Sequence, residues 1–170
     1  ICSGIKSIKL NTVVMKAFNN DEITDFVELT KNNDITVRFI ELMPFDSHQI
    51  WKTGKFYSAD RIVNDLRSHY RTLIPVKGSS TEYYIFKIKE YTGRVAVIPS
   101  CARSLCSACN RIRVTADGNL LNCLYSRSET NMRDAIRNGM KDEGLKKLIV
   151  GSMQKKLKDG LIAQNYGNDP

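Results

Sequence analysis

The sequence predicts a mixed α/β protein, and three observations lead to this prediction. Near its start, an alternating β-branched segment is followed by a segment of helical period and then by an apolar run. Further along, two pairs of short alternating segments flank turn-forming residues, which is typical of β-hairpins. Segments of helical character close the chain. With 170 residues, of which 42% are hydrophobic, the chain is long enough to bury most of its apolar surface.

The N-terminal part predicts a strand–helix–strand unit. Residues 7–15 alternate and are rich in β-branched side chains, which favours a strand. Residues 35–42 form a nearly continuous apolar run, as expected of a strand covered on both faces. Between them, Ile23 and Phe26 belong to a helical repeat that predicts a helix over residues 21–31. Two strands joined in this way pair in parallel through a right-handed crossover.

The composition changes character near Phe45, which places a domain boundary between residues 1–44 and 45–170. After a loop expected over residues 44–55, Ser58 is suited to cap a helix that reaches about Tyr70. The expected hairpins join residues 83–90 to 94–98 and 111–115 to 120–124, and closing helices are expected over residues 132–138 and 143–158.

The net charge of +8 points to an anionic partner or to a basic solvated surface. The densest basic run, residues 155–158, contains no aromatic residue, whereas nucleic-acid sites usually combine the two. A local anion site is therefore favoured over nucleic acid. No run of about 18 apolar residues is present, so no membrane span is expected. The chain does not begin with Met, and we expect it to be a truncated chain.

Four of the five cysteines fall between Cys101 and Cys123, and such a cluster without a secretory signal indicates a metal rather than disulfides. Cys106 and Cys109 are separated by two residues, so both sulfurs can converge on one centre. The second predicted hairpin returns Cys123 to the same place. Three thiolates leave one position of a tetrahedral centre open, as a catalytic or substrate-binding metal requires.

Cys101 leaves a second arrangement open, because the four cysteines together also fit a closed four-thiolate site. Their spacing alone does not decide between a structural zinc and an iron–sulfur cluster. Arg111 and Arg113 follow Cys109 and would share one face of a strand. They are either two exposed strand residues or, beside a metal, a fork of two guanidinium groups suited to phosphate.

The stretch from Cys106 to Tyr125 closely resembles the C-terminal cluster motif of the GTP 3′,8-cyclases of molybdenum cofactor biosynthesis, a radical S-adenosylmethionine family. Residues 9–15 and 19–22 resemble a late strand and loop of that family's barrel, and residues 37–46 resemble its next strand. Residues 132–134 fit the segment that follows the third cysteine. The resemblance covers nearly the whole chain.

The resemblance implies that residues 1–44 are the last strand–helix–strand units of an incomplete (β/α)6 TIM-type barrel. Residues 45–170 would be an α+β iron–sulfur subdomain with β-hairpins that binds GTP. Carried over position by position, the ligands of a second 4Fe–4S cluster, whose open iron holds the guanine ring, would be Cys106, Cys109 and Cys123. The GTP-binding residues would be Lys9, Arg111 and Arg113, and those near S-adenosylmethionine would be Arg38 and Met43.

The resemblance also implies radical conversion of GTP to 3′,8-cyclo-7,8-dihydro-GTP, with cyclic pyranopterin monophosphate synthase acting downstream, and it allows a homodimer. S-adenosylmethionine and a first 4Fe–4S cluster would be bound mainly by an N-terminal half, whose C-x-x-x-C-x-x-C motif these residues lack. No catalytic residue is therefore expected in this chain, and the chain alone is expected to be inactive. The family works in bacterial cytoplasm or, in eukaryotes, in mitochondria.

Cys101 stands where the family does not require cysteine, so we expect it not to bind the cluster. The alternative to the cyclase hypothesis is a zinc-stabilised, non-catalytic binding domain for a phosphate-bearing or nucleic-acid partner.

Overall fold

The computed structural model describes residues 5, 7–43, 54–77, 84–100, 109–126, 128–158 and 162. The chain divides into two compact units, residues 1–103 and 104–170. The boundary predicted near Phe45 would separate a barrel part from a cluster-binding domain. It falls within the first unit and stays a prediction. The loop expected over residues 44–55 lies largely outside the described residues.

The first unit is built on a five-stranded sheet with the order β1-β2-β5-β4-β3. β1 pairs in parallel with β2, β2 pairs in parallel with β5, and β4 and β3 follow in antiparallel pairs. The strands are β1 (Ile8–Val14), β2 (Ile35–Glu41), β3 (Leu73–Val76), β4 (Tyr84–Ile88) and β5 (Arg94–Ile98). The predicted α/β class, the parallel pairing of the first two strands and the β4–β5 hairpin are confirmed.

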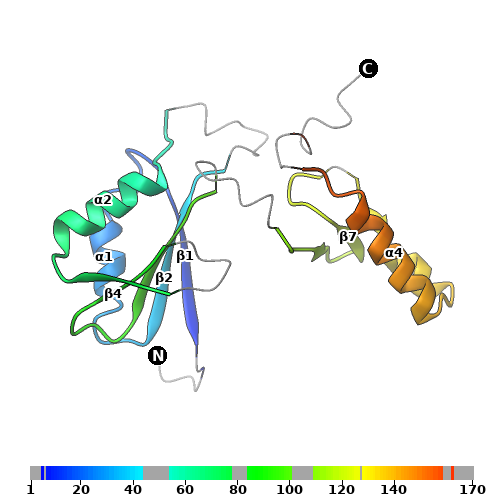
Figure 1. Ribbon diagram of the computed structural model, residues 1–170, viewed down its shortest axis with the longest axis horizontal. Helices are drawn as coiled ribbons and strands as arrows, with labels where there is room; N and C mark the ends of the chain where they lie inside the picture. Colours follow the sequence, from blue (N-terminus) through cyan, green and yellow to red (C-terminus); the bar gives the residue numbers. More distant parts are fainter. Residues whose placement is uncertain are drawn as a thin grey trace. The chain divides into compact units, whose positions relative to one another are not determined.

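Two helices, α1 (Ile23–Glu28) and α2 (Ala59–His69), lie on the same side of this sheet (Figure 1). α2 begins as predicted, because the Ser58 hydroxyl accepts a hydrogen bond from the Arg61 amide at 3.3 Å. α1 is shorter than the predicted helix. The core between helices and sheet contains fully buried side chains from both layers, among them Phe39, Ile62 and Leu66.

The sequence did not predict β3. This strand contains Pro75, which lies opposite Phe86 in the register with β4. Proline cannot donate to a ladder and is tolerated on an edge strand, where β3 lies.

The face of β1 and β2 that points away from the helices is polar and basic. Lys9 and Asn11 are exposed, and the parallel register places them beside Thr36 and Arg38 respectively. Because residues paired across adjacent strands share a face, these four side chains lie on one surface. Parallel sheets are usually covered on both faces, so a polar open face is typical of a wall that borders a polar cavity.

The second unit contains a three-stranded antiparallel sheet, β6 (Arg113–Val114), β7 (Asn119–Leu121) and β8 (Thr130–Asn131), in the order β6-β7-β8. Two helices follow, α3 (Met132–Arg137) and α4 (Asp142–Gln154). The predicted hairpin is confirmed as β6–β7, with Gly118 at a φ of 84° in its turn. Among the described residues of the unit, Leu120 is the only buried hydrophobic side chain. In the described part of the chain, no helix is long and apolar enough to cross a membrane.

We predict that Gly93→Ala strongly destabilises the first unit. Gly93 donates its amide to the Thr30 carbonyl at 2.8 Å, and a Cβ on it would lie 2.3 Å from the Ile35 carbonyl oxygen and 2.7 Å from that of Asn33. Because backbone atoms cannot move aside cheaply, we expect a loss of about 2–4 kcal/mol in the free energy of unfolding, measured by urea denaturation with circular dichroism.

The matched control is Gly151→Ala in α4, where a Cβ would meet no atom within 4 Å. Alanine is favoured over glycine inside a helix by roughly 0.5–1 kcal/mol, so this variant should be at least as stable as the parent chain. Equal urea midpoints for Gly93→Ala and the parent chain would show that the close approach is absent.

Candidate metal centre

Two of the predicted cluster ligands, Cys109 and Cys123, belong to the described residues, whereas Cys106 and Cys101 lie outside them. Cys109 precedes β6 and Cys123 follows β7, so the antiparallel pairing of these strands brings both to the same end of the hairpin. Both thiols are free and half-buried. The hairpin therefore brings Cys123 to the same end as Cys109, while the convergence of three sulfurs stays a prediction.

Each of the two sulfurs accepts a hydrogen bond from the amide two residues further along the chain. The Tyr125 amide donates to the Cys123 Sγ at 3.5 Å, and the Arg111 amide donates to the Cys109 sulfur. Such bonds favour the thiolate, which is the form that binds metals. The local geometry fits a thiolate-bound metal, and it suits zinc and iron–sulfur alike.

The end of α4 contacts both segments that carry these cysteines. The side-chain amide of Asn122, next to Cys123, donates to the Ser152 carbonyl at 2.7 Å, and both residues are buried. Lys156 Nζ donates to the carbonyl oxygens of Cys109 at 2.8 Å and Arg111 at 3.3 Å. Sequence analysis did not single out Asn122 and considered Lys156 only as part of the basic run 155–158, since no local pattern links these residues to partners at least 30 residues away.

The electrostatic surroundings of Cys109 favour its thiolate. Burial by itself would raise the pKa of the Cys109 thiol, but the Arg111 amide, the Lys156 ammonium and the Arg111 charge outweigh burial, so the pKa is lowered. The lowered pKa favours the thiolate, which is the form of cysteine that binds metals.

Arg111 and Arg113 are half-buried and alternate with exposed Ile112 and Val114, which are 45% and 65% exposed. This agrees with the prediction that the two arginines share one side of the segment. Partly buried arginines beside exposed apolar residues reverse the ordinary preference.

The remaining predicted site residues belong to the first unit. Lys9 is near the start of β1 and Arg38 is in the middle of β2, both on the open face of the sheet. Met43 follows the C-terminal end of β2 and is half-buried. The structure brings Lys9 and Arg38 onto one surface. Met43 lies beyond the C-terminal end of β2, whereas Lys9 lies near the N-terminal end of β1. Barrel enzymes build their active sites at the C-terminal ends of the strands.

Glu41, which sequence analysis did not single out, is fully buried at the end of β2. Its carboxylate oxygens accept hydrogen bonds from the Ala59 amide at 3.0 Å and the Ser100 amide at 2.9 Å. Ala59 is the first residue of α2, and a carboxylate is stabilised at the N-terminus of a helix. The signal in the sequence was an acidic residue inside an otherwise apolar strand.

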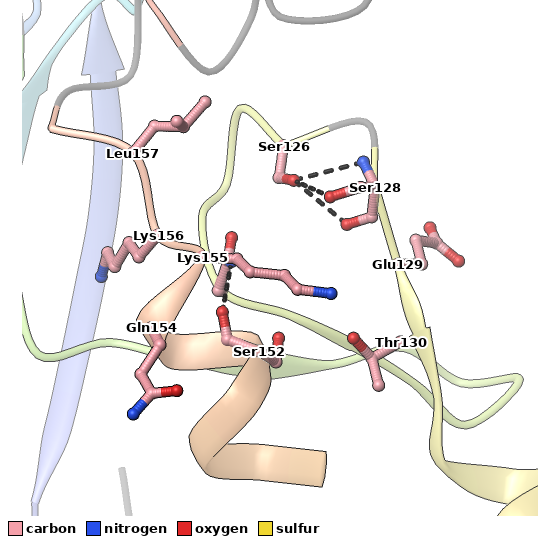
Figure 2. Close-up of a pocket in the computed structure, with 10 residues that line it drawn as sticks. Ser126, Ser128, Glu129, Thr130, Ser152, Gln154, Lys155, Lys156 and Leu157 are labelled. Atoms are coloured by element: carbon pink, nitrogen blue, oxygen red, sulfur yellow. Dashed lines mark hydrogen bonds between the residues drawn. The ribbon is translucent and has the colours of Figure 1, made fainter.

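A pocket of about 660 Å³ opens between the end of α4 and the segment from β7 to β8 (Figure 2). Its lining is polar and includes Asn122, Ser126, Thr130, Lys155 and Lys156. Figure 2 shows the side chains of Lys155 and Lys156 leaving the backbone in opposite directions. The carboxyl group of Glu129 also lines the pocket, opposite in charge to the two lysines.

Within the described residues, no three His, Cys, Asp or Glu side chains are grouped as a metal site. Two of the four clustered cysteines fall outside that part of the chain. For the proposed metal site, the structure therefore describes the surroundings of Cys109 and Cys123.

Residues 35–161 match the sequence family described as Molybdenum Cofactor Synthesis C. The chain is 46% identical to a GTP 3′,8-cyclase of Chlorobaculum tepidum over 155 residues, which are 91% of this chain and 47% of the relative. It is 40% identical to molybdenum cofactor biosynthesis protein 1 of Mus musculus, over 90% of this chain and 24% of the relative. A relative from Arabidopsis thaliana named mitochondrial GTP 3′,8-cyclase is 37% identical, over 90% of this chain and 39% of the relative. The chain thus spans about half or less of these relatives.

We predict that Cys109 of the metal-free chain is alkylated by iodoacetamide at a lower pH than an ordinary thiol. Only the thiolate reacts, and the pKa of Cys109 is lowered from its usual value of 9.0. Its alkylation rate should therefore reach its plateau below the plateau pH of N-acetylcysteine, when followed by peptide-resolved mass spectrometry. A Cys109 profile that coincides with that of N-acetylcysteine would contradict the prediction.

Proposed function

Because the chain belongs to the Molybdenum Cofactor Synthesis C family, as its motifs predicted, we propose that it supplies the second cluster and the GTP-binding part of a GTP 3′,8-cyclase. A relative named molybdenum cofactor biosynthesis protein 1 supports a role in that pathway. The proposed reaction of the complete enzyme converts GTP to 3′,8-cyclo-7,8-dihydro-GTP, which cyclic pyranopterin monophosphate synthase would consume. The chain alone should not turn over GTP.

The observation that carries the proposal is the pair of sulfur-accepting turns at Cys109 and Cys123. In each turn, an amide points at a sulfur that can become a thiolate ligand. Together with Cys106, these residues would hold a 4Fe–4S cluster through three thiolates. When bound, that cluster offers one iron without a protein ligand, which can accept the guanine ring.

The sparse core of the second unit supports a metal in this place. Among its described residues, Leu120 is the only buried hydrophobic side chain. Small units without a sufficient apolar core commonly depend on a disulfide or a metal, and the thiols of Cys109 and Cys123 are free. Metal binding would then supply folding free energy as well as a ligand site.

The basic residues are suited to hold and orient the nucleotide. Arg111 and Arg113 present planar guanidinium groups beside the cysteines, a geometry that binds phosphate oxygens in pairs. Holding the purine and the phosphates at separate points fixes the orientation of the ribose between them. In this proposal the chain contributes binding and orientation, and the radical chemistry comes from S-adenosylmethionine and the first cluster.

The first unit supports the barrel part of the proposal. Its parallel strands β1, β2 and β5 carry helices on one face, which is the arrangement of a (β/α) barrel wall. The open face carries Lys9, proposed to contact GTP, and Arg38, proposed with Met43 to lie near S-adenosylmethionine. A polar face of this kind would border the interior of the barrel.

We predict that the chain, purified and reconstituted without oxygen, is brown and holds about four irons per chain, as a 4Fe–4S cluster requires. Serine substitutions of Cys106, Cys109 and Cys123 should each lose most of the iron. Cys101→Ser is the matched control and should retain it. Iron analysis and the visible absorption spectrum measure both.

A colourless chain with about one zinc would instead support the zinc-stabilised binding domain. Loss of iron in Cys101→Ser would mean that four thiolates close the site, which leaves no iron for a purine.

We predict that Arg111→Ala and Arg113→Ala each weaken GTP binding to the cluster-loaded chain by roughly 10–100-fold. A hydrogen bond to a charged group contributes about 1.5–3 kcal/mol, and this range corresponds to that factor. Isothermal titration calorimetry measures the affinity. Arg137→Ala, an exposed substitution at the end of α3, is the control and should leave the affinity unchanged. If the arginine variants bind GTP as the parent chain does, these residues do not hold the nucleotide.

A further inference from the structure

We propose that Lys156 is a positioning residue for the cluster: it fixes the backbone turn that presents Cys109 and places a positive charge beside that ligand. The inference rests on the proposed function, because it concerns the same site. It gives the segment after α4 a role in the metal site, and this role cannot be recognised from the cysteine motif or from the two arginines.

Lys156 contacts two backbone carbonyls of the ligand turn and the Cys109 sulfur. Its ammonium donates to the Cys109 carbonyl at 2.8 Å and to the Arg111 carbonyl at 3.3 Å. The amide of Arg111 meanwhile donates to the Cys109 sulfur. The lysine therefore binds both carbonyls and reaches the sulfur that the Arg111 amide also contacts, and this sets the orientation of the turn.

The side chain of Lys156 is half-buried, and so are the hydrogen bonds it makes. Removal of the ammonium would leave two partly buried carbonyl oxygens without this donor. Leaving such groups unpaired is costly, so the turn should rearrange rather than keep its geometry.

The second cysteine segment is tied to the same element. Asn122, next to Cys123, donates to the carbonyl of Ser152 in the last turn of α4, four residues before Lys156. One short segment thus contacts both cysteine segments, which the β6–β7 hairpin also joins. Such an arrangement sets the separation of the two sulfurs, and ligand geometry of this kind depends on the groups that hold the ligands.

The charge of Lys156 has a second effect that a purely structural contact would not have. A cation close to a ligating sulfur stabilises the more negative, reduced form of a cluster, and cluster potentials respond to net charge and to hydrogen bonds at the sulfurs. Lys155, the next residue, is exposed and its side chain points the other way (Figure 2). It therefore provides a control of equal charge at the neighbouring position.

The test compares Lys156→Met with Lys155→Met in the full chain, first without metal and then after anaerobic reconstitution with iron and sulfide. In the metal-free chain, hydrogen exchange of the amides in residues 109–114 should become about tenfold faster in Lys156→Met and stay unchanged in Lys155→Met. In the reconstituted chain, Lys156→Met should lose its iron to a chelator about 10–100-fold more readily. The midpoint potential of the iron it retains should become more negative, while Lys156→Arg should keep the parent potential.

Each result decides one question. Unchanged hydrogen exchange in Lys156→Met overturns the positioning role, whether or not a cluster binds. Faster exchange with unchanged iron retention and potential also overturns it, because the contact would then serve the fold alone. If the parent chain takes up no cluster at all, the proposed function fails. Faster exchange in Lys156→Met would then still show that Lys156 holds the turn.

Discussion

The second unit depends on one constraint: it has almost no apolar core with which to hold its shape. Among its described residues, Leu120 is the only buried hydrophobic side chain, and the other buried residues are the polar pair Asn122 and Ser152. A hydrogen bond adds only about 1 kcal/mol to stability, so a few of them cannot fix a unit of this size. Thiolate–metal bonds can, since structural zinc contributes about 10–16 kcal/mol in small domains. Ligand binding and folding should therefore be coupled in this unit, and the residues that orient the cysteines also determine its fold.

The first unit, in contrast, is held together by its apolar side chains. Its core is large, and Phe39, Ile62 and Leu66 are fully buried between helices and sheet. The buried carboxylate of Glu41 adds to this core. It accepts hydrogen bonds from the Ala59 amide at the start of α2 and from the Ser100 amide, which follows β5. Ser100 begins the segment that leads to the cysteines. A rigid sheet thus fixes the point from which the chain leaves toward the cysteine cluster, and functional sites are commonly built on loops that leave such a scaffold.

The sequence predicted the elements whose formation depends on local pattern. The alternation of β1, the apolar run of β2, the Ser58 cap of α2 and the turn at Gly118 are each visible within a few residues. The features it missed depend on partners that are distant along the chain. β3 is a strand despite Pro75 because β4 lies beside it, and the contacts of Lys156 join residues 45 and 47 positions apart. The predicted ligand residues came from motif spacing, whereas the hydrogen bonds that orient them could not be found in this way.

The different roles proposed for Lys156 and for the two arginines follow from side-chain chemistry. A lysine ammonium is a compact charge with three donors, so Lys156 can satisfy two backbone carbonyls and still act on the Cys109 sulfur. A guanidinium group is planar and holds two phosphate oxygens at once, which suits Arg111 and Arg113 to the ligand rather than to the backbone. An arginine at position 156 would keep the positive charge beside Cys109, but it could not converge its donors on two carbonyls in the same way. In the proposed site, Lys156 therefore holds the carbonyls of the turn that carries Cys109, and the two arginines remain for the nucleotide.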